Sequence, residues 1–232
     1  MSKRGHHWAA GIDREERVEA PLAILPAVAF QVLLATVSLA NDWQIWGLPG
    51  WVWLLAVAPE IALMLALSLP VSRRHLERTR SRRAVSVTLV VVMGVVNAFA
   101  LIVLIGSLLS SHEQHGGELL LKGLTIWGTN VLSFALLFWE LDGGGPDARR
   151  GAPPGALRDF QFPQMENPQL ARPQWQPHLL DYVYLSFTNS IAFSPTDAMP
   201  LSPRVKMLML AESGLSVVAV LLVAARAVNI LV

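Results

Sequence analysis

The stretch AVSVTLVVVMGVVNAFALIVLIGSLLSSH, residues 84–112, decides the fold, because its 29 residues carry no formal charge. A helix that crosses roughly 30 Å of hydrocarbon needs about 20 apolar residues. The core of a water-soluble domain does not require an uncharged run of this length. The stretch therefore predicts a helix that spans a lipid bilayer.

Four further apolar runs accompany this stretch, and each is long enough for a helix. Pro21–Asn41 is uncharged, Trp43–Ser72 has Glu60 as its one charge, and Leu119–Trp139 has Lys122. The last run, 207–232, contains Glu212 and Arg226. None alternates as a barrel strand would, so the expected class is an all-α membrane protein. We predict a bundle of five transmembrane helices, at 21–41, 51–70, 84–110, 119–140 and 206–231.

The composition supports a membrane protein and excludes several function classes. The chain is 53% hydrophobic and 15% charged, against about 25% charged in a soluble domain. It contains no Cys, which excludes disulfides, thiolate nucleophiles and Cys-based zinc sites. A net charge of +1 gives no support to nucleic-acid binding. No phosphate loop, dinucleotide-binding glycine pattern or Ser-His-Asp order is present, so we predict no enzyme, catalytic residue, cofactor or metal site.

Lys and Arg are distributed unevenly along the chain, and their distribution predicts the orientation. Residues 1–20 hold four of them, Arg73–Arg83 six and Arg149–Lys206 six, whereas 42–50 and 111–118 hold none. This alternation follows the positive-inside rule. We expect a bacterial cytoplasmic (inner) membrane, with the N-terminus cytoplasmic and the C-terminus periplasmic. Tryptophans are expected at the outer interface, and Trp139 at the inner one.

The chain divides into a cytoplasmic tail (1–20), a four-span bundle (21–140), a cytoplasmic Pro/Gly-rich connection (141–177) and a C-terminal part (178–232). Gly143–Gly145 should end the fourth helix, and Pro146 should prevent its continuation. The connection is either a regulatory or partner-binding loop or an ordered crossover. Its aromatic segments FQFPQM and PQWQP favour the ordered crossover.

His178–Phe193 is a half-helix of 16 residues, about 24 Å long. That length is too short to cross the bilayer, and its apolar character disfavours a free position in water. We predict a re-entrant half-helix before the last span. Ser202 and Pro203 are suited to the N-cap and first turn of that span.

Residues 184–228 resemble part of the pore-loop cation channels. The pore helix corresponds to YLSFTNS, the filter to SPTDAMP, and the inner helix to LSPRVKMLMLAESGLSVVAVLLVAARAV. The resemblance implies a cation-conducting homo-oligomer, a tetramer if it forms a pore. The TVGYG-type signature of potassium channels is absent, which leaves potassium selectivity without support. The half-helix would enter from the cytoplasm, as in glutamate-receptor-type pores.

The pattern Y-x-S-F-T…F-x-x-T-D, followed by V-N near the end, is similar to an uncharacterised bacterial family of multi-pass inner-membrane proteins. That resemblance implies the fold and carries no activity. The matching positions are Tyr184, Ser186, Phe187, Thr188, Phe193, Thr196, Asp197, Val228 and Asn229.

Seven residues are candidates for an ion pathway: Glu60, Thr188, Asn189, Ser190, Thr196, Asp197 and Glu212. Glu60 and Glu212 lie inside predicted spans, where a carboxyl group either coordinates a cation or carries a proton, or else is paired or buried as a neutral acid. The polar residues 188–190 either line a pathway or join helices by hydrogen bonds. Thr196 and Asp197 lie either at a pore mouth or in a turn.

Three functions remain open on the sequence. The first is a pore-loop-like cation channel subunit, in which the half-helices of several copies converge on one axis. The second is a non-transporting membrane scaffold or partner-binding subunit, which needs no polar path. The third is a small proton-coupled carrier. The partners implied are the lipid bilayer, an inorganic cation and further copies of the chain.

Overall fold

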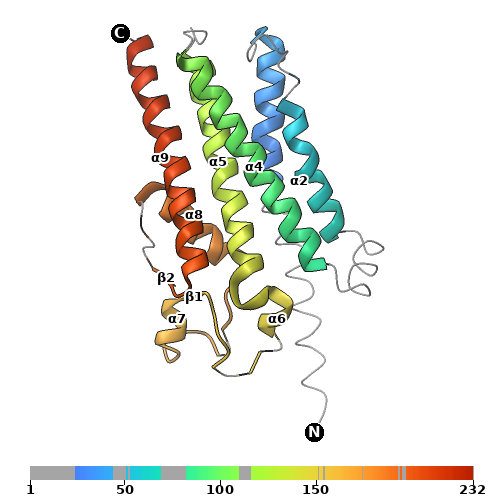
Figure 1. The fold of residues 1–232 in the computed structure, drawn as a ribbon, viewed down its shortest axis with the longest axis vertical. Helices are drawn as coiled ribbons and strands as arrows, with labels where there is room; N and C mark the ends of the chain where they lie inside the picture. The colour runs from blue at the N-terminus through green and yellow to red at the C-terminus, as the bar shows by residue number, and fades with distance from the viewer. Residues whose placement is uncertain are drawn as a thin grey trace.

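The computed structural model describes residues 24–43, 51, 53–68, 82–109, 116–150, 152–153, 155–173, 175–192, 194 and 197–231. The tail 1–20, Thr196 and most of the basic segment 73–83 lie outside the described residues. Five long helices run side by side along one axis (Figure 1). They are Ile24–Ala40, α2 (Trp53–Ser68), α4 (Arg82–Leu109), α5 (Gly116–Leu141) and α9 (Pro203–Leu231). Each coincides with one of the predicted apolar runs.

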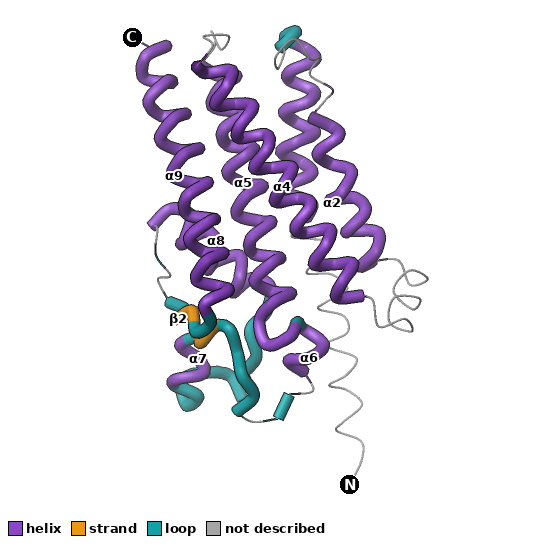
Figure 2. Tube along the Cα trace, in the orientation of Figure 1, coloured by secondary structure: helices purple, strands orange, loops and turns teal. Residues whose placement is uncertain are grey.

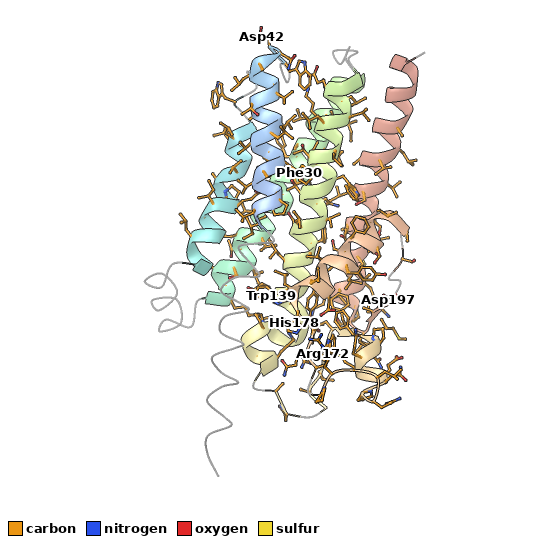
Figure 3. The ribbon with its side chains drawn as sticks, turned by 180° about the vertical axis from the view of Figure 1, so that it is seen from behind. Phe30, Asp42, Trp139, Arg172, His178 and Asp197 are labelled. Atoms are coloured by element: carbon orange, nitrogen blue, oxygen red, sulfur yellow. The ribbon has the colours of Figure 1, made fainter. Side chains whose placement is uncertain are left out.

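Two segments, Arg83–Ser107 and Gly117–Gly144, are long and apolar enough to cross a membrane. They occupy different places in the bundle. In the most apolar 18 residues of each segment, 28% are buried for Arg83–Ser107 and 72% for Gly117–Gly144. Helix α5 is therefore the central helix, and it contacts α4, α8 (Leu179–Ala192) and α9. The Ile24–Ala40 helix also approaches α5 closely, because a side chain at Gly128 would meet the Phe30 ring at 3.3 Å (Figure 3).

The long helices carry large apolar side chains on their outer faces. Val95 and Phe99 of α4 are each 62% exposed, and Leu55 and Leu221 project from α2 and α9 in the same way. Glu60 and Glu212 of those two helices are buried instead. An apolar exterior around a polar interior is the arrangement that a lipid environment favours.

Two apolar clusters fill the bundle, one toward each end. The cluster at the end of the crossover joins Phe138, Phe160 and Tyr182. Ring contacts between them, 5.3 Å for Phe138–Phe160 and 6.2 Å for Phe160–Tyr182, fix the crossover against α5 and α8. The second cluster lies toward the other end, where Asp42 is found (Figure 3). It comprises Leu34, Ala35, Leu101, Val103, Leu104, Leu119, Ile126 and Ala219.

Helix α5 ends where its glycines predict. A short 3-10 turn, η2 (Asp142–Gly144), follows Leu141, and Gly143, Gly144 and Gly145 have φ of 55°, 90° and 99°. This left-handed region favours glycine, since a Cβ is strained there. The chain continues through α6 (Pro146–Arg150), β1 (Phe160–Gln161) and α7 (Pro163–Glu166), which gather with the loops at one end of the bundle (Figure 2).

Asp142 is the centre of this crossover. Its carboxylate accepts hydrogen bonds from the Asp159 N–H at 2.7 Å and from the Tyr182 hydroxyl at 2.6 Å. Arg149 donates to the carbonyls of Trp139 and Asp142 at 2.6 and 2.7 Å. A buried carboxylate with several donors holds backbone segments together that have little regular structure of their own. For the described residues, the structure agrees with the ordered-crossover interpretation.

Helix α8 has 14 described residues; of the predicted ends, His178 precedes the helix and Phe193 lies outside the described residues. Its first turn lies at the crossover end of α5, where Tyr182 contacts Asp142, and its later part reaches Trp127, whose ring lies 5.7 Å from that of Phe187. The chain then returns to the crossover. There β2 (Met199–Pro200) pairs antiparallel with β1, and α9 begins (Figure 1). Thus the half-helix enters the bundle and the chain leaves it at the same end.

Two details differ from the sequence-based predictions. Trp139, expected at the inner membrane interface, is only 3% exposed, because it packs inside the crossover cluster. Helix α9 begins at Pro203 as predicted, but the Ser202 hydroxyl donates to Asp159 Oδ1 at 2.6 Å. That contact ties the start of α9 to the crossover.

Candidate functional site

A layer of polar side chains crosses the middle of the bundle, between the two apolar clusters. On α4, Asn97 lies between Met93 of one cluster and Leu101 of the other. On α9, Glu212 and Ser216 lie in the same way between Met209 and Ala219. We call the following nine side chains, none more than 7% exposed, the polar layer: Gln31, Glu60, Asn97, Thr129, Asn130, Ser186, Asn189, Glu212 and Ser216.

Glu212 lies where α5, α8 and α9 meet, and it is fully buried. The side chain of Asn189 donates to its Oε2 at 2.7 Å, and Ser186 Oγ makes a short contact with its Oε1. Asn189 uses its second amide proton on the Met209 carbonyl at 3.0 Å. Both carboxyl oxygens of Glu212 therefore have partners within the chain.

The number of protons available for the hydrogen bonds around Glu212 shows how its carboxyl group can be protonated. Ser186 Oγ lies 2.7 Å from the Val131 carbonyl as well as against Glu212 Oε1. A hydroxyl has one proton to donate. When Ser186 donates it to Val131, a protonated Glu212 completes the network by donating to Ser186. The site thus accommodates a neutral Glu212, with Ser186 between the acid and the α5 backbone.

Asn130 links this site to the centre of the layer. Its side-chain amide donates to Ser216 Oγ at 3.1 Å and to the Glu212 carbonyl at 3.3 Å. Asn97, on α4, donates to the Ile126 carbonyl of α5 at 3.0 Å. Both asparagines therefore join helices. They also line a narrow gap between α4, α5 and α9.

Glu60 belongs to α2, in the part of the layer formed by α2, α4, α5 and the Ile24–Ala40 helix. Helices α2 and α9 lie on opposite sides of α5 (Figure 1). Glu60 Oε1 accepts a hydrogen bond from Gln31 at 2.5 Å. Within the part of the chain that the structure describes, Glu60 Oε2 has no hydrogen-bond partner, and neither has Gln31 Oε1 or Thr129 Oγ1. All three atoms belong to side chains that are at most 4% exposed.

Those three side chains line one small cavity. The cavity measures about 10 Å³, and Asn97 and Thr125 complete its polar lining. A polar cavity needs roughly 10–15 Å³ to hold one water molecule. Thr125 donates to the Leu121 carbonyl at 2.8 Å, so its oxygen lone pairs are left as acceptors. The cavity is therefore rich in oxygen acceptors.

Two further buried acids, Glu118 and Asp159, have basic partners outside the polar layer. Lys122 and Glu118 form an ion pair of 2.5 Å within α5, and both are buried. In the crossover, Arg204 donates to both oxygens of Asp159. Burial raises the pKa of Asp159, but the hydrogen bonds from Arg204, Ser202 and the Gly143 N–H outweigh it and lower that pKa below its ordinary 3.8.

Of the seven predicted site residues, the structure brings Asn189 and Glu212 together. Glu60 lies apart from them, across α5. The hydroxyls of Thr188 and Ser190 donate to carbonyls of α8 itself, at 2.9 and 2.8 Å. Asp197 is exposed beside a groove of about 350 Å³ along α8, and Thr196 lies outside the described residues.

Six members of the layer were not among the candidates: Gln31, Asn97, Thr129, Asn130, Ser186 and Ser216. Gln31 is a polar amide inside an uncharged apolar run, and its position there could have marked it as a candidate site residue. The hydroxyl residues gave no such signal, because Ser and Thr are common in membrane helices and satisfy themselves on their own backbone.

Comparison with protein-family models, with curated proteins and with solved structures finds no match to this chain.

Proposed function

We propose that this chain is an integral membrane protein whose five long helices cross the bilayer, with α8 as a re-entrant helix. Two observations support the proposal: the exposed apolar faces of the helices, and the return of the chain after α8 to the end where it entered. The proposed setting is a bacterial cytoplasmic membrane. The crossover, with Arg149 and Arg204, faces the cytoplasm, as the positive-inside rule suggests.

We further propose that the polar layer moves a proton or a monovalent cation through a single chain, which makes the protein a small carrier. One observation carries this proposal. Two carboxyl groups lie buried between two apolar clusters, on opposite sides of α5, and Asn97, Thr129 and Asn130 lie between their helices. Buried carboxyls within a membrane are costly, and transporters use them to exchange ions.

The arrangement of α8 gives less support to a pore around a shared axis. Its polar residues Ser186 and Asn189 face α5 and α9 of their own chain. Its exposed face is apolar and aromatic: Leu180, Tyr184, Phe187 and Ile191. A pore of several copies would need polar groups on that face.

A non-transporting scaffold is the second candidate, and the Glu212 site favours it. Every carboxyl oxygen of Glu212 is satisfied inside the chain, as in a network that only joins helices. A scaffold would conduct nothing, so the two functions differ in a measurable way.

The test is ion flux in liposomes that contain the purified protein. We expect proton or alkali-cation flux above that of empty liposomes. Glu60→Gln, close in size and still able to hydrogen-bond, should reduce the flux at least tenfold. Glu166→Gln, a change on the exposed part of α7, serves as the matched control and should leave it unchanged. No flux from well-folded protein would favour the scaffold.

Orientation has its own test, because the chain has no Cys of its own. A single Cys at Leu157, which is 94% exposed in the crossover, should be protected from an impermeant thiol reagent in intact cells. A single Cys at Asn41, exposed at the opposite end, should be labelled. The reverse pattern would overturn the proposed topology.

A further inference from the structure

We infer that the cavity between Gln31, Glu60 and Thr129 is a binding site for one dehydrated alkali cation, with Na⁺ as the best fit. The inference rests on the proposed function and names its ion. It starts from the three oxygen atoms without partners, Gln31 Oε1, Glu60 Oε2 and Thr129 Oγ1, which belong to residues around the same cavity.

Leaving these atoms unpaired is costly. A buried polar atom that loses water without gaining a partner costs about 1–3 kcal/mol. Three such atoms at one place, whereas both carboxyl oxygens of Glu212 have partners, indicate that something else supplies the contacts. Their chemistry identifies the kind of partner. A carboxylate, an amide carbonyl and a hydroxyl are hard oxygen ligands, and such ligands replace the hydration shell of hard cations.

The charge of the cavity selects a monovalent ion. Among the described residues, Glu60 is the one acidic residue that lines it, and no Lys, Arg or His of this part of the chain does so. One bound monovalent cation leaves the site neutral when Glu60 is ionised. A divalent cation would leave an uncompensated positive charge inside the apolar bundle, which is expensive.

The volume limits the size of the ion. About 10 Å³ accommodates one water-sized sphere, so an ion keeps none of its own hydration shell there. Na⁺ is smaller than a water molecule and fits without moving the surrounding helices. Larger organic cations do not fit.

The experiment is thermal unfolding of the purified full-length protein in detergent, with NaCl, LiCl or KCl replacing choline chloride at constant ionic strength. A ligand that binds the folded state raises the melting temperature. We expect Na⁺ to raise it by roughly 3–5 °C for each tenfold increase above the dissociation constant. K⁺ should have a smaller effect. Radiolabelled Na⁺ should bind one ion per chain.

Two variants test the assignment. Glu60→Gln should abolish the Na⁺-dependent shift, and Thr129→Val, which keeps the shape and removes the oxygen, should weaken it at least fivefold in Na⁺ concentration. Thr36→Val is the matched control, because the Thr36 hydroxyl is exposed and bonds to carbonyls of its own helix. It should leave the shift intact. If Glu60→Gln fails to fold, Thr129→Val and its control Thr36→Val still test whether Na⁺ binds in the cavity.

Equal melting temperatures of the wild type in NaCl and choline chloride would overturn the inference, as would a preference for K⁺. A Na⁺ shift that survives both cavity variants would also overturn it. This outcome is distinguishable from that of the proposed function. If Na⁺ raises the melting temperature but the protein shows no flux, the Na⁺ site stands and the carrier function is wrong. If protons cross but Na⁺ leaves the melting temperature unchanged, the carrier function stands and the Na⁺ site is wrong.

Discussion

Glu60 and Glu212 are alike in sequence and in burial, yet their surroundings differ. Each is an acid inside an apolar helix and at most 1% exposed. Glu212 has partners for both carboxyl oxygens, whereas Glu60 has one partner and faces a cavity. Burial alone therefore does not tell the role of a carboxyl group in such a bundle. The unused hydrogen-bonding capacity around it is more informative.

The difference comes from the elements that surround each acid. Helix α8 is short and presents Ser186 and Asn189 to Glu212 one turn apart. Glu60 is surrounded by long helices whose backbone groups are already paired within each helix, so side chains alone can reach it. Gln31 is the one that does so, through a single hydrogen bond.

The largest effect is expected for Glu212→Ala. The change removes two hydrogen bonds, leaves Ser186 and Asn189 with buried polar groups to satisfy, and opens a cavity. We expect a loss of about 3–4 kcal/mol in the free energy of unfolding. Glu60→Ala should cost about half as much, since it breaks one bond. Unfolding of both variants in mixed micelles measures the difference, and equal losses would remove the distinction between the sites.

A smaller effect is expected when the partners are truncated instead of the acids. Asn189→Ala breaks hydrogen bonds to Glu212 and to the Met209 carbonyl, and we expect a loss of about 1–2 kcal/mol. Gln31→Ala removes the hydrogen bond that Gln31 donates to Glu60 and should cost about 1 kcal/mol. The same denaturant titration compares them. A larger loss for Gln31→Ala would indicate that Glu60 is the structural acid.

The hydroxyls should respond in opposite directions. Ser186→Ala removes a hydroxyl that bonds to both the Val131 carbonyl and Glu212, and it should destabilise the protein by about 1 kcal/mol. Thr129→Val removes an oxygen that has no hydrogen-bond partner, so without Na⁺ we expect no loss, or a gain of about 0.5–1 kcal/mol. Melting temperatures in choline chloride test this pair. A clear destabilisation by Thr129→Val would mean that its hydroxyl is structurally used.

The smallest effect concerns the start of α9, the helix that carries Glu212. Because the hydrogen bonds of Arg204, Ser202 and Gly143 outweigh burial, the folded-state pKa of Asp159 lies below its ordinary 3.8. A lowered pKa contributes stability above the unfolded-state pKa, and this stability is lost as the pH falls through the folded-state value.

Acidification from about pH 5 to about pH 3 should therefore weaken the junction between the crossover and α9. Unfolding of the wild type should become easier over this range, and Asp159→Asn should show less of that dependence. Hydrogen exchange of the β1 and β2 amides reports on the junction directly. An identical pH dependence in wild type and variant would show that other carboxyl groups are responsible.

The sequence by itself determined the helices. Uncharged runs longer than about 20 residues have one stable conformation in an apolar solvent, because a helix pairs its backbone groups internally. The predicted boundaries of the third helix, 84–110, differ from those in the structure, Arg82–Leu109, by one or two residues at each end. Gly143–Gly145 likewise predicted the end of α5, since the positive φ values there suit glycine.

Only the tertiary structure decided which polar residues meet. Gln31 and Glu60 are 29 residues apart, and Ser186 and Glu212 are 26 apart, on different helices. Hydropathy shows how apolar a helix is, but a contact between helices depends on their relative rotation and axial shift. These follow from side-chain packing across the whole bundle. The sequence could therefore predict two acids inside the bundle, and the packing of the helices determined that one is satisfied and the other faces a cavity.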